Sequence, residues 1–420
     1  MTNSGSDRPE RTEVVIVGAG PTGLTAAVRL AQLGIPHVLL DLRAAPTQTS
    51  NAALVHASSV ELLAELEVGD DLVVAGRVIR GLRIVDRGRP LVRLGFTDLP
   101  SRYAFALGVP QSTTEALLLR RLEALGESVR RLHRVESVQT HADGHLVTGI
   151  ADRSGSPVPF AIQARYVIAA DGSRSAVRSA LGINFPGETY PSQFVLADIA
   201  LTSRASSDDE ATINLSPLGV TVIAKLPSGN HRIVATVAQD ADVPETPDRA
   251  FVDAVLRDRG LPARSAAEPE WASRFRVHHR VADRFRLGGV FLAGDAAHVH
   301  SPAAGQGMNT GIADAYDLAT RMAAVLTGQV GESTLDGYER TRRAAALEVL
   351  RFTDRMTRAA TLRNPVARSM RRVAAGTLGR IPALQHRLTM WITGLERSPL
   401  RGDLPTVRPR PLTPASSRDT

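Results

Sequence analysis

The sequence of 420 residues contains no cysteine, and this absence excludes disulfide bonds, thiolate zinc sites and a cysteine nucleophile. Lysine is nearly absent, because Lys225 is the only lysine among 50 basic residues, a bias more typical of a GC-rich genome than of a surface selected for charge. No uninterrupted apolar stretch approaches the roughly 18 residues of a membrane-spanning helix. The polar start, residues 1–11, lacks the apolar region of a signal peptide. We therefore expect a cytoplasmic protein with no integral membrane segment.

Basic charge is concentrated toward the C-terminus. Residues 340–401 carry 14 arginines against three acids, a net charge of +11 in a chain whose total is +7. Such a region can contact anionic lipid or nucleic acid, although the pattern favours a solvated helical face. Only Phe352 and Trp391 are aromatic there, which argues against stacking on single-stranded nucleic acid. We expect no nucleic-acid partner, and weak peripheral membrane contact through these helices is the alternative left open.

A glycine-rich segment near the start, G-A-G-P-T-G at residues 18–23, lies between a β-branched run at 14–17 and an apolar, alanine-rich stretch at 24–33. This order predicts a buried strand, a tight turn and a helix, the context that a dinucleotide-binding fingerprint requires. Its first glycine permits the turn, its second lets the backbone approach a pyrophosphate, and its third lets the helix pack closely on the strand. The pyrophosphate would lie at the positive end of the helix dipole.

An acidic residue follows the next predicted strand. Residues 37–40 are apolar, and they end at Asp41, which lies 23 positions after Gly18. This is close to the spacing of about 20 expected for an acid that binds the ribose of a dinucleotide. We therefore expect Asp41 to accept a hydrogen bond from the adenosine ribose, the alternative being that it only ends a strand.

The rest of the chain predicts an α/β fold that an antiparallel sheet interrupts. The length allows a large core and two closely joined domains. Apolar and polar residues alternate between about 194 and 239, with turn signals at 217–219 and 227–230, which is typical of antiparallel strands. The other expected elements are buried strands at 166–170 and 289–293 and helices at 115–125 and from 311 to about 394.

A second glycine-rich segment begins about 270 residues after the first, with Gly294-Asp295, and continues to Asn309. A nicotinamide dehydrogenase needs only the first segment, so the pair indicates a flavin held between two loops. Residues 307–309, at the end of this segment, lead into a helix. Their backbone N–H groups can point at the flavin pyrimidine, where negative charge grows on reduction. His298 is interpreted as a positioning residue, and a metal site with His300 is not expected, because no third ligand has suitable spacing.

Three motifs in this order resemble those of the group A flavoprotein monooxygenases, the single-component FAD-dependent aromatic hydroxylases with the para-hydroxybenzoate hydroxylase fold. The first is the fingerprint with its strand-end acid, and the third is the Gly294-Asp295 pair. The second, Asp171 to Arg178, reads D-G-S-R-S-A-V-R and resembles the family's D-G-x-x-S-x-x-R motif. The resemblance covers roughly residues 12–355.

Smaller matches extend the resemblance, with one departure. Val109-Pro110-Gln111 resembles a segment whose glutamine or arginine contacts FAD in the family. Asn51-Ala52 stands where many relatives have arginine followed by alanine, so Arg43 is the expected substitute for that contact. The residues that the resemblance assigns to FAD are Gly18, Gly20, Pro21, Thr22, Gly23, Asp41, Arg43, Gln111, Asp171, Gly172, Gly294, Asp295, Pro302, Gly305, Gly307, Met308 and Asn309.

The resemblance also implies a domain arrangement. The expected fold class is α/β, with a Rossmann-like FAD-binding domain on a mostly parallel sheet, an inserted antiparallel substrate sheet and a helical C-terminal region. The expected boundaries are 12–180 and 286–345 for the FAD-binding domain, 181–285 for the substrate-binding sheet, 346–400 for the basic helical region, and 1–11 and 402–420 for unstructured ends.

The implied reaction is an NAD(P)H-dependent hydroxylation, in which the reduced flavin forms a C4a-hydroperoxide with O2 and transfers an oxygen atom to an electron-rich carbon. The protein would supply a dry, closed pocket. Because only one dinucleotide fingerprint is present, NADPH or NADH is expected to bind transiently near Asp171, Arg174 and Arg178. Asp171 could instead cap a buried strand end. No catalytic residue is selected by spacing, the reaction needs little acid or base from the protein, and any base that activates the substrate is expected to line the sheet at 194–237.

Rival functions differ in what the sequence would show. A flavin-dependent halogenase would carry a tryptophan-rich motif, which is absent. A flavin reductase of isoprenoid double bonds shares the second loop, and a hydroxylase or epoxidase of a membrane-derived isoprenoid or quinone precursor would also use the basic C-terminal region.

Aromatic residues form only 4% of the chain. We therefore expect an aliphatic pocket, which favours a bulky polycyclic or polyketide-like substrate.

Overall fold

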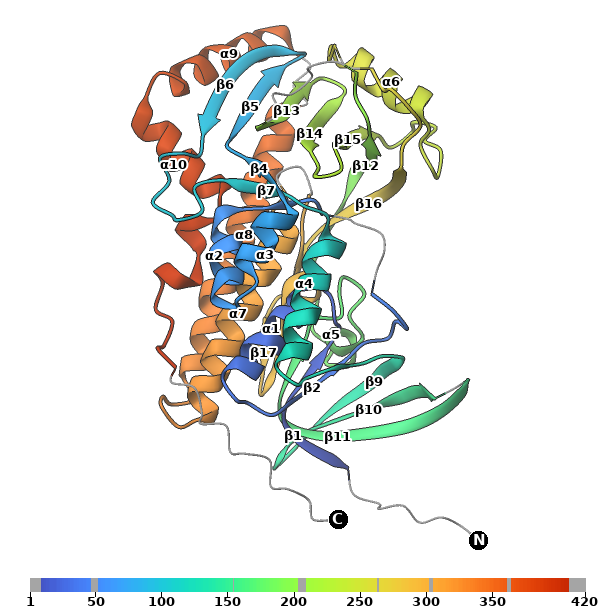
Figure 1. Ribbon diagram of the computed structural model, residues 1–420, viewed down its shortest axis with the longest axis vertical. Coiled ribbons are helices and arrows are strands. Elements are labelled where there is room, and N and C mark those ends of the chain that lie inside the picture. The colour runs from blue at the N-terminus through green and yellow to red at the C-terminus, as the bar shows by residue number, and fades with distance from the viewer. Residues whose placement is uncertain are drawn as a thin grey trace.

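The computed structural model describes residues 9–46, 52–153, 155–202, 209–262, 264–301, 305–360 and 364–407. Within these residues the strands form two eight-stranded sheets and one three-stranded sheet. Figure 1 shows the first sheet in the lower half of the molecule and the second sheet in the upper half, with long helices beside and between them. The chain crosses between the halves several times, so neither large sheet comes from one continuous stretch.

The first sheet contains the predicted nucleotide-binding unit. Its main path is β17 (Arg286–Leu287), β18 (Val290–Leu292), β11 (Ser156–Ala169), β1 (Glu10–Val17), β2 (His37–Leu40) and β8 (Val129–Arg130). The neighbours from β18 through to β8 pair in parallel, whereas β10 (Gly144–Arg153) and β9 (His133–His141) extend antiparallel from β11. The β-branched run at 14–17 is buried throughout, as expected for a central parallel strand.

A group of helices accompanies the first sheet, and several of them pack on one another. They are α1 (Pro21–Gln32), α2 (Ala57–Glu65), α3 (Gly69–Ala75), α4 (Gln111–Ala124), α5 (Ala176–Ala180), α7 (Gly307–Leu326) and α8 (Thr334–Ala360). Helix α1 contacts both α4 and α7, and α7 contacts α8. Helix α1 begins three residues before the predicted stretch because Pro21 fits its first turn, where no backbone N–H is needed.

The second sheet contains the predicted antiparallel strands. Its order is β19 (His298–Val299), β16 (Trp271–Val281), β12 (Gly187–Ile199), β15 (His231–Ala238), β14 (Gly219–Lys225), β13 (Glu210–Ser216), β5 (Gly81–Asp86) and β6 (Arg89–Gly95). A small third sheet joins β3 (Leu54–Val55), β7 (Ala106–Gly108) and β4 (Arg77–Ile79). On the second sheet, Val252 and Leu256 of α6 (Arg249–Asp258) pack against Ile223 and Ile233.

The C-terminal elements return to the second sheet. They are α9 (Pro365–Leu378), α10 (Pro382–Ile392) and two short 3-10 turns, η3 (Leu395–Arg397) and η4 (Pro399–Arg401), and one further turn, η1 (Gly294–Ala296), opens the second glycine-rich loop. Figure 1 shows α9 and α10 at the upper left, and both contact β6. None of the helices described is long and apolar enough to cross a membrane.

The range 181–285 is too narrow for the second sheet. Strands β5 and β6, which come from the first half of the chain, also belong to the second sheet, and β5 pairs in parallel with β13. At the opposite edge of the sheet, β19, which lies within the second glycine-rich segment, pairs with β16. Local alternation could not reveal the pairing of β5 with β13, because these two strands lie more than a hundred residues apart in the sequence.

The expected unstructured ends also need correction where the structure describes them. Strand β1 starts at Glu10, whose carboxylate receives two 2.6 Å hydrogen bonds from Arg130. Residues 402–407 pack on the protein: Asp403 accepts a hydrogen bond from Arg321 at 2.6 Å, and Leu404 contacts the main core. Hydrogen bonds to arginines and an apolar contact therefore hold both end segments, whose polar composition had indicated that they are unstructured.

Candidate functional site

The first glycine-rich loop shows why each of its glycines is needed. Gly18 has φ of +101°, and a Cβ there would lie 2.3 Å from the carbonyl oxygen of Ala170 at the end of β11. A Cβ at Gly23 would lie 1.8 Å from the carbonyl oxygen of Gly18. Gly20 differs, since a Cβ there would meet nothing within 4 Å and the residue lines a cavity. Two glycines therefore serve close packing, and Gly20 leaves room for a ligand.

Asp41 is fixed at the end of β2, next to this loop. One carboxylate oxygen accepts a 2.6 Å hydrogen bond from the N–H of Ala19, and the other accepts one of 2.7 Å from the N–H of Arg43. Burial alone would raise the pKa of Asp41, but these hydrogen bonds and the Arg43 guanidinium outweigh it and lower the pKa. The result is an ionised acceptor at the cavity edge. Arg43 also lines the cavity, with its guanidinium bonded to Asp41.

The second glycine-rich loop packs directly on the first. Gly294 has φ of +59°, and a Cβ there would lie 2.5 Å from the Thr22 hydroxyl. A Cβ at Gly311 of α7 would lie 2.4 Å from the same hydroxyl. Thr22 therefore brings α1, the Gly294 loop and α7 into contact. Asp295 follows on this loop and lines the cavity with an exposed side chain.

The start of α7 presents backbone donors. The side chain of Gln306, which precedes this helix, makes no capping hydrogen bond. The first N–H groups of a helix, here those of Gly307, Met308 and Asn309, have no acceptor within it. The Asn309 side chain is occupied elsewhere: its amide donates to the carbonyl oxygens of Leu54 and Gly305, at 2.9 and 2.6 Å, and its oxygen accepts from a backbone N–H. It therefore holds the loop in place. Pro302 lies outside the described residues.

The D-G-x-x-S-x-x-R segment contributes both to structure and to the cavity. Asp171 accepts a hydrogen bond from the N–H of Val177 and so stabilises the start of α5, while Asp171, Gly172 and Arg174 line the cavity. Burial raises the pKa of Asp171, against opposing hydrogen bonds from Ser175 and the backbone. Both interpretations of Asp171, as a cap and as a cavity residue, agree with this position.

The two arginines of that segment have different environments. Arg178 is 7% exposed, and its guanidinium donates to the carbonyl oxygens of Ala296 and Ser173, at 2.9 and 2.8 Å. It also lies 3.9 Å above the Phe185 ring. Arg174 is exposed and lines the cavity. Arg178 therefore ties this segment to the Gly294 loop, whereas Arg174 faces the cavity.

The start of α4 also contributes to the cavity wall. Gln111 lines the cavity, and its side-chain amide donates to Glu115 at 2.9 Å. Its backbone N–H donates to the carbonyl oxygen of Ala52 at 3.0 Å. Burial raises the pKa of Glu115, which the Gln111 hydrogen bond opposes. Gln111 is thus held at the cavity by its own helix and by the segment before β3.

One cavity of about 770 Å³ unites these loops with the second sheet. Its far half is lined mainly by aliphatic side chains, and these include Ile79, Leu82, Ile84, Ile213, Leu215, Val220, Val222, Val234, Leu388 and Ile392. The expected base is not found among the described cavity residues between 194 and 237. Arg232 is the only ionisable one there, it forms an ion pair with Asp198, and a guanidinium does not act as a base. Three histidines, His56, His278 and His300, line the cavity instead.

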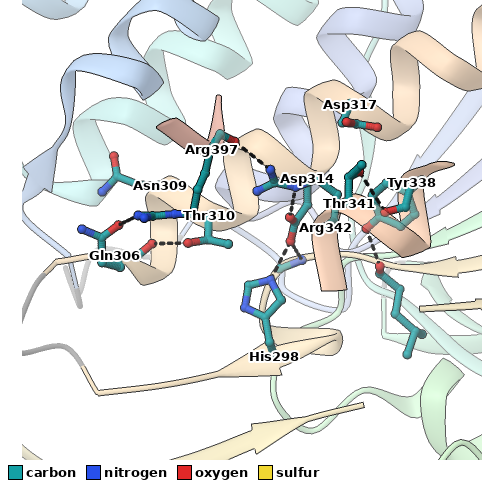
Figure 2. A network of polar contacts seen from close by, with 12 residues as sticks. His298, Gln306, Asn309, Thr310, Asp314, Asp317, Tyr338, Thr341, Arg342 and Arg397 are labelled. Atoms are coloured by element: carbon teal, nitrogen blue, oxygen red, sulfur yellow. Dashed lines mark hydrogen bonds and ion pairs between the residues drawn. The ribbon is translucent and has the colours of Figure 1, made fainter. Parts of the chain in front are cut away.

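A buried charge network lies behind the Gly294 loop, as Figure 2 shows. The Asp314 carboxylate is fully buried and interacts with the Nε2 of His298 at 2.6 Å and the Nε of Arg342 at 2.7 Å. It also accepts a 3.2 Å hydrogen bond from the N–H of Gly294. Burial would raise the pKa of Asp314, but the interactions and hydrogen bonds with His298 and Arg342 lower it. His298 thus occupies a positioning site and does not line the cavity.

The network continues into the C-terminal segment. Arg342 donates to the carbonyl oxygen of Arg397 at 3.0 Å, and Gln306 donates to that of Ile392 at 2.8 Å. Arg397 stacks 4.0 Å above the Trp391 ring. Sequence reasoning missed Asp314 and Arg342. One signal was present: α7 consists mostly of small and apolar residues, and a charged residue such as Asp314 in such a helix indicates a buried partner. Within the described residues no cluster of three acidic or histidine side chains could hold a metal ion.

Comparison with known proteins places this geometry in context. A family model described as an FAD binding domain matches residues 11–353. The chain is 35% identical to 6-methylpretetramide 4-monooxygenase of Streptomyces rimosus over 391 residues, which is 91% of this chain and 69% of that protein. Its structure resembles the anhydrotetracycline hydroxylase OxyS from Streptomyces rimosus, with a TM-score of 0.75 and 32% identity over 94% of this chain and 78% of that one. The fold also matches p-nitrophenol 4-monooxygenase PnpA from Pseudomonas putida DLL-E4, with a TM-score of 0.80 and 24% identity over 92% and 98% of the two chains.

Substituting two of the three glycines of the first loop separates their role in packing from their role in leaving space for a ligand. Gly18→Ala is expected to lower the free energy of unfolding by at least about 1–2 kcal/mol, because of its positive φ and the Ala170 carbonyl. Gly20→Ala should change the stability of the FAD-free protein by less than about 0.5 kcal/mol but weaken FAD binding roughly tenfold. Denaturant unfolding and fluorescence titration with FAD measure the two effects. Equal stability losses in both variants would contradict the assignment.

The buried network predicts a large stability effect at Arg342. Arg342→Leu leaves the fully buried Asp314 without its main cation, so the free energy of unfolding should fall by about 3–5 kcal/mol. Arg130→Leu is the matched control, because its ion pair with Glu10 is about half exposed, and removing it should cost about 0–1 kcal/mol. Urea unfolding monitored by circular dichroism measures both. Similar losses would show that Asp314 is well accommodated without Arg342.

Proposed function

The chain belongs to the FAD-binding-domain family of flavoprotein monooxygenases, and from this premise we propose that it hydroxylates an aromatic, polycyclic and polyketide-like small molecule with NADPH or NADH as the electron donor. The observation that carries the proposal is the single cavity joining the two glycine-rich loops to an aliphatic wall. A cofactor bound to the loops would reach directly into the space where an apolar substrate is enclosed.

The residues present suit FAD. Gly20 leaves open space at the start of α1, where a pyrophosphate would meet the helix dipole. Asp41 offers an ionised acceptor for a ribose, and uncapped N–H groups at the start of α7 offer donors for the pyrimidine carbonyl. The bound, reduced flavin supplies the chemistry that activates O2. The chain's own part is to hold it between two loops and to exclude water with the aliphatic half of the cavity.

The substrate class follows from the lining and from the relatives. The far half of the cavity offers mainly apolar surface, and burial of apolar substrate area there is favourable by roughly 25 cal/mol per Å². Two relatives above 30% identity are named for 6-methylpretetramide and anhydrotetracycline. An isoprenoid or quinone precursor would also find the aliphatic wall acceptable, so it is the alternative substrate to test.

Electron donation is proposed to occur beside the D-G-x-x-S-x-x-R segment. Arg174 is an exposed guanidinium at the cavity and suits the phosphates of NADPH or NADH, whereas Arg178 is engaged with backbone carbonyls. Peripheral membrane contact is not part of the proposal. Arg371 and Arg372 of the basic region form ion pairs with buried Asp86, so part of this charge binds the C-terminal helices to the second sheet.

The function is tested by turnover of a small panel. The purified protein, reconstituted with FAD, should show flavin absorption bands near about 370 and 450 nm. NADPH and NADH oxidation under air is then followed with anhydrotetracycline, 4-nitrophenol and farnesol, together with released hydrogen peroxide and products formed under ¹⁸O₂. We expect donor oxidation to be stimulated by the polycyclic phenol, with one labelled oxygen in the product and little peroxide.

Other outcomes of the panel reject parts of the proposal. Labelled product from farnesol alone would favour the isoprenoid alternative, and product from 4-nitrophenol alone would reject the polycyclic class. Reduction of a double bond without incorporation of ¹⁸O would identify a reductase. Failure to bind flavin after reconstitution would reject the whole assignment.

The donor proposal predicts different effects for the two arginines. Arg174→Ala should raise the KM for NADPH or NADH roughly tenfold by removing a charge-assisted contact, while FAD binding and unfolding stay unchanged. Arg178→Ala should instead lower the free energy of unfolding by about 1–3 kcal/mol, since two carbonyl oxygens lose a donor. Stopped-flow reduction of the flavin and thermal unfolding measure these effects. An unchanged KM in Arg174→Ala would place the donor elsewhere.

A further inference from the structure

His300 lines the cavity close to the start of α7. It follows β19 directly, is 8% exposed and lines the cavity wall. A Cβ added to Gly307, at the start of α7, would lie 3.9 Å from its Cε1 atom. Its ring is nearly parallel to that of His298, with ring centres 6.1 Å apart. The imidazole is therefore held beside the backbone donors assigned to the flavin and within reach of the substrate space.

The hydrogen bonding of His300 determines which nitrogen carries the proton. Nδ1 lies 3.2 Å from the carbonyl oxygen of Ser301, and a carbonyl oxygen can only accept. Nδ1 must therefore be the N–H donor, which leaves a lone pair on Nε2 in the neutral ring. Nε2 is buried and has no hydrogen-bond partner in the part of the chain that the structure describes. Buried acceptors are normally satisfied, so this atom indicates a missing donor.

The surroundings keep the imidazole neutral. Burial lowers the pKa of His300 to about 4, and the nearby His298, His279 and Arg397 lower it as well, against the hydrogen bond to Ser301. At neutral pH the ring therefore carries no charge and Nε2 stays an acceptor. A neutral acceptor is also less costly than a carboxylate to place beside an apolar substrate.

We propose that Nε2 of His300 accepts a hydrogen bond from a ring hydroxyl of the aromatic substrate, and thereby selects phenolic substrates and fixes which ring carbon faces the flavin. The inference rests on the proposed function, because it requires an aromatic substrate in this cavity. It also supplies a side-chain acceptor, which the described cavity residues between 194 and 237 do not offer. His300 would be a catalytic residue in the sense that it touches the substrate.

The chemistry favours hydrogen bonding over full proton transfer. A phenolic pKa lies near 10, as for tyrosine, far above that of His300, so the proton stays on the substrate oxygen in the bound state. Oxygen transfer to the ring withdraws electrons from it and makes the hydroxyl more acidic. The hydrogen bond to Nε2 is then stronger in the transition state than in the ground state, which is the condition for accelerating the reaction.

The test compares a phenol with its methyl ether on the FAD-bound protein. 2-Naphthol and 2-methoxynaphthalene are titrated separately, and the perturbation of the flavin absorption spectrum reports binding without requiring turnover. We expect the wild-type protein to bind 2-naphthol roughly tenfold more tightly than the ether, the size expected for one hydrogen bond in a buried site. The measurement stays informative even if the panel for the proposed function yields no product.

Three variants isolate the acceptor atom. His300→Leu should bring the phenol-to-ether ratio close to one, whereas His300→Gln, which retains an acceptor oxygen, should keep part of it. His145→Leu is the matched control, because His145 is also a buried histidine of lowered pKa but lies on β10, outside the cavity. Its ratio should equal that of the wild type.

Several outcomes would overturn the inference. One is a wild-type ratio near one, and a second is that neither probe perturbs the flavin spectrum. A third is an unchanged ratio in His300→Leu. A loss of FAD affinity in His300→Leu with the ratio preserved would mean that Nε2 contacts the flavin instead. Because His300 has a pKa of about 4, the ratio should stay constant from pH 8 to pH 5.5. A decline centred near 6.5, the pKa of an unperturbed histidine, would also reject it.

Discussion

The placement of the second glycine-rich loop depends on one fully buried carboxylate, Asp314. It contacts His298 on one side, Arg342 on the other, and the backbone N–H of Gly294. These groups belong to β19, α8 and the loop itself, so a single side chain fixes three segments relative to α7. Buried ion pairs often contribute little net stability compared with apolar packing. Their value here is geometric, because a buried carboxylate tolerates very few arrangements of its partners.

The same constraint connects the cofactor side to the C-terminal region. Arg342 reaches the backbone of Arg397, and Gln306 reaches that of Ile392. Ile392 in turn lines the cavity together with Leu388 of α10. The arginine-rich region thus contributes to the cavity wall, and several of its guanidiniums bind acids or carbonyls of the same chain. Net charge counted along the sequence overstated how much of it faces outward.

Sequence reasoning located the elements whose causes are local. The strand at residues 37–40 matches β2, and the fingerprint loop has the backbone geometry that its glycines indicated, because steric limits on φ and close packing act within a few residues. It missed the pairing of β5 with β13 and the partners of Asp314. Those depend on contacts across more than a hundred residues or on packing that turns a polar side chain inward, and no periodicity records either.

The cavity itself illustrates why the polar specificity that we propose would come from His300, directly after β19. The second sheet supplies mainly aliphatic side chains, which favour a large apolar substrate but cannot orient it, since hydrophobic contact has little directionality. Orientation requires a few polar atoms with fixed direction. A carboxylate would carry a desolvation cost in such surroundings, whereas a histidine whose Nδ1 is bound to its neighbour's carbonyl presents a single directed lone pair. His300 meets this condition, and it lies where the rigid network around Asp314 holds its strand.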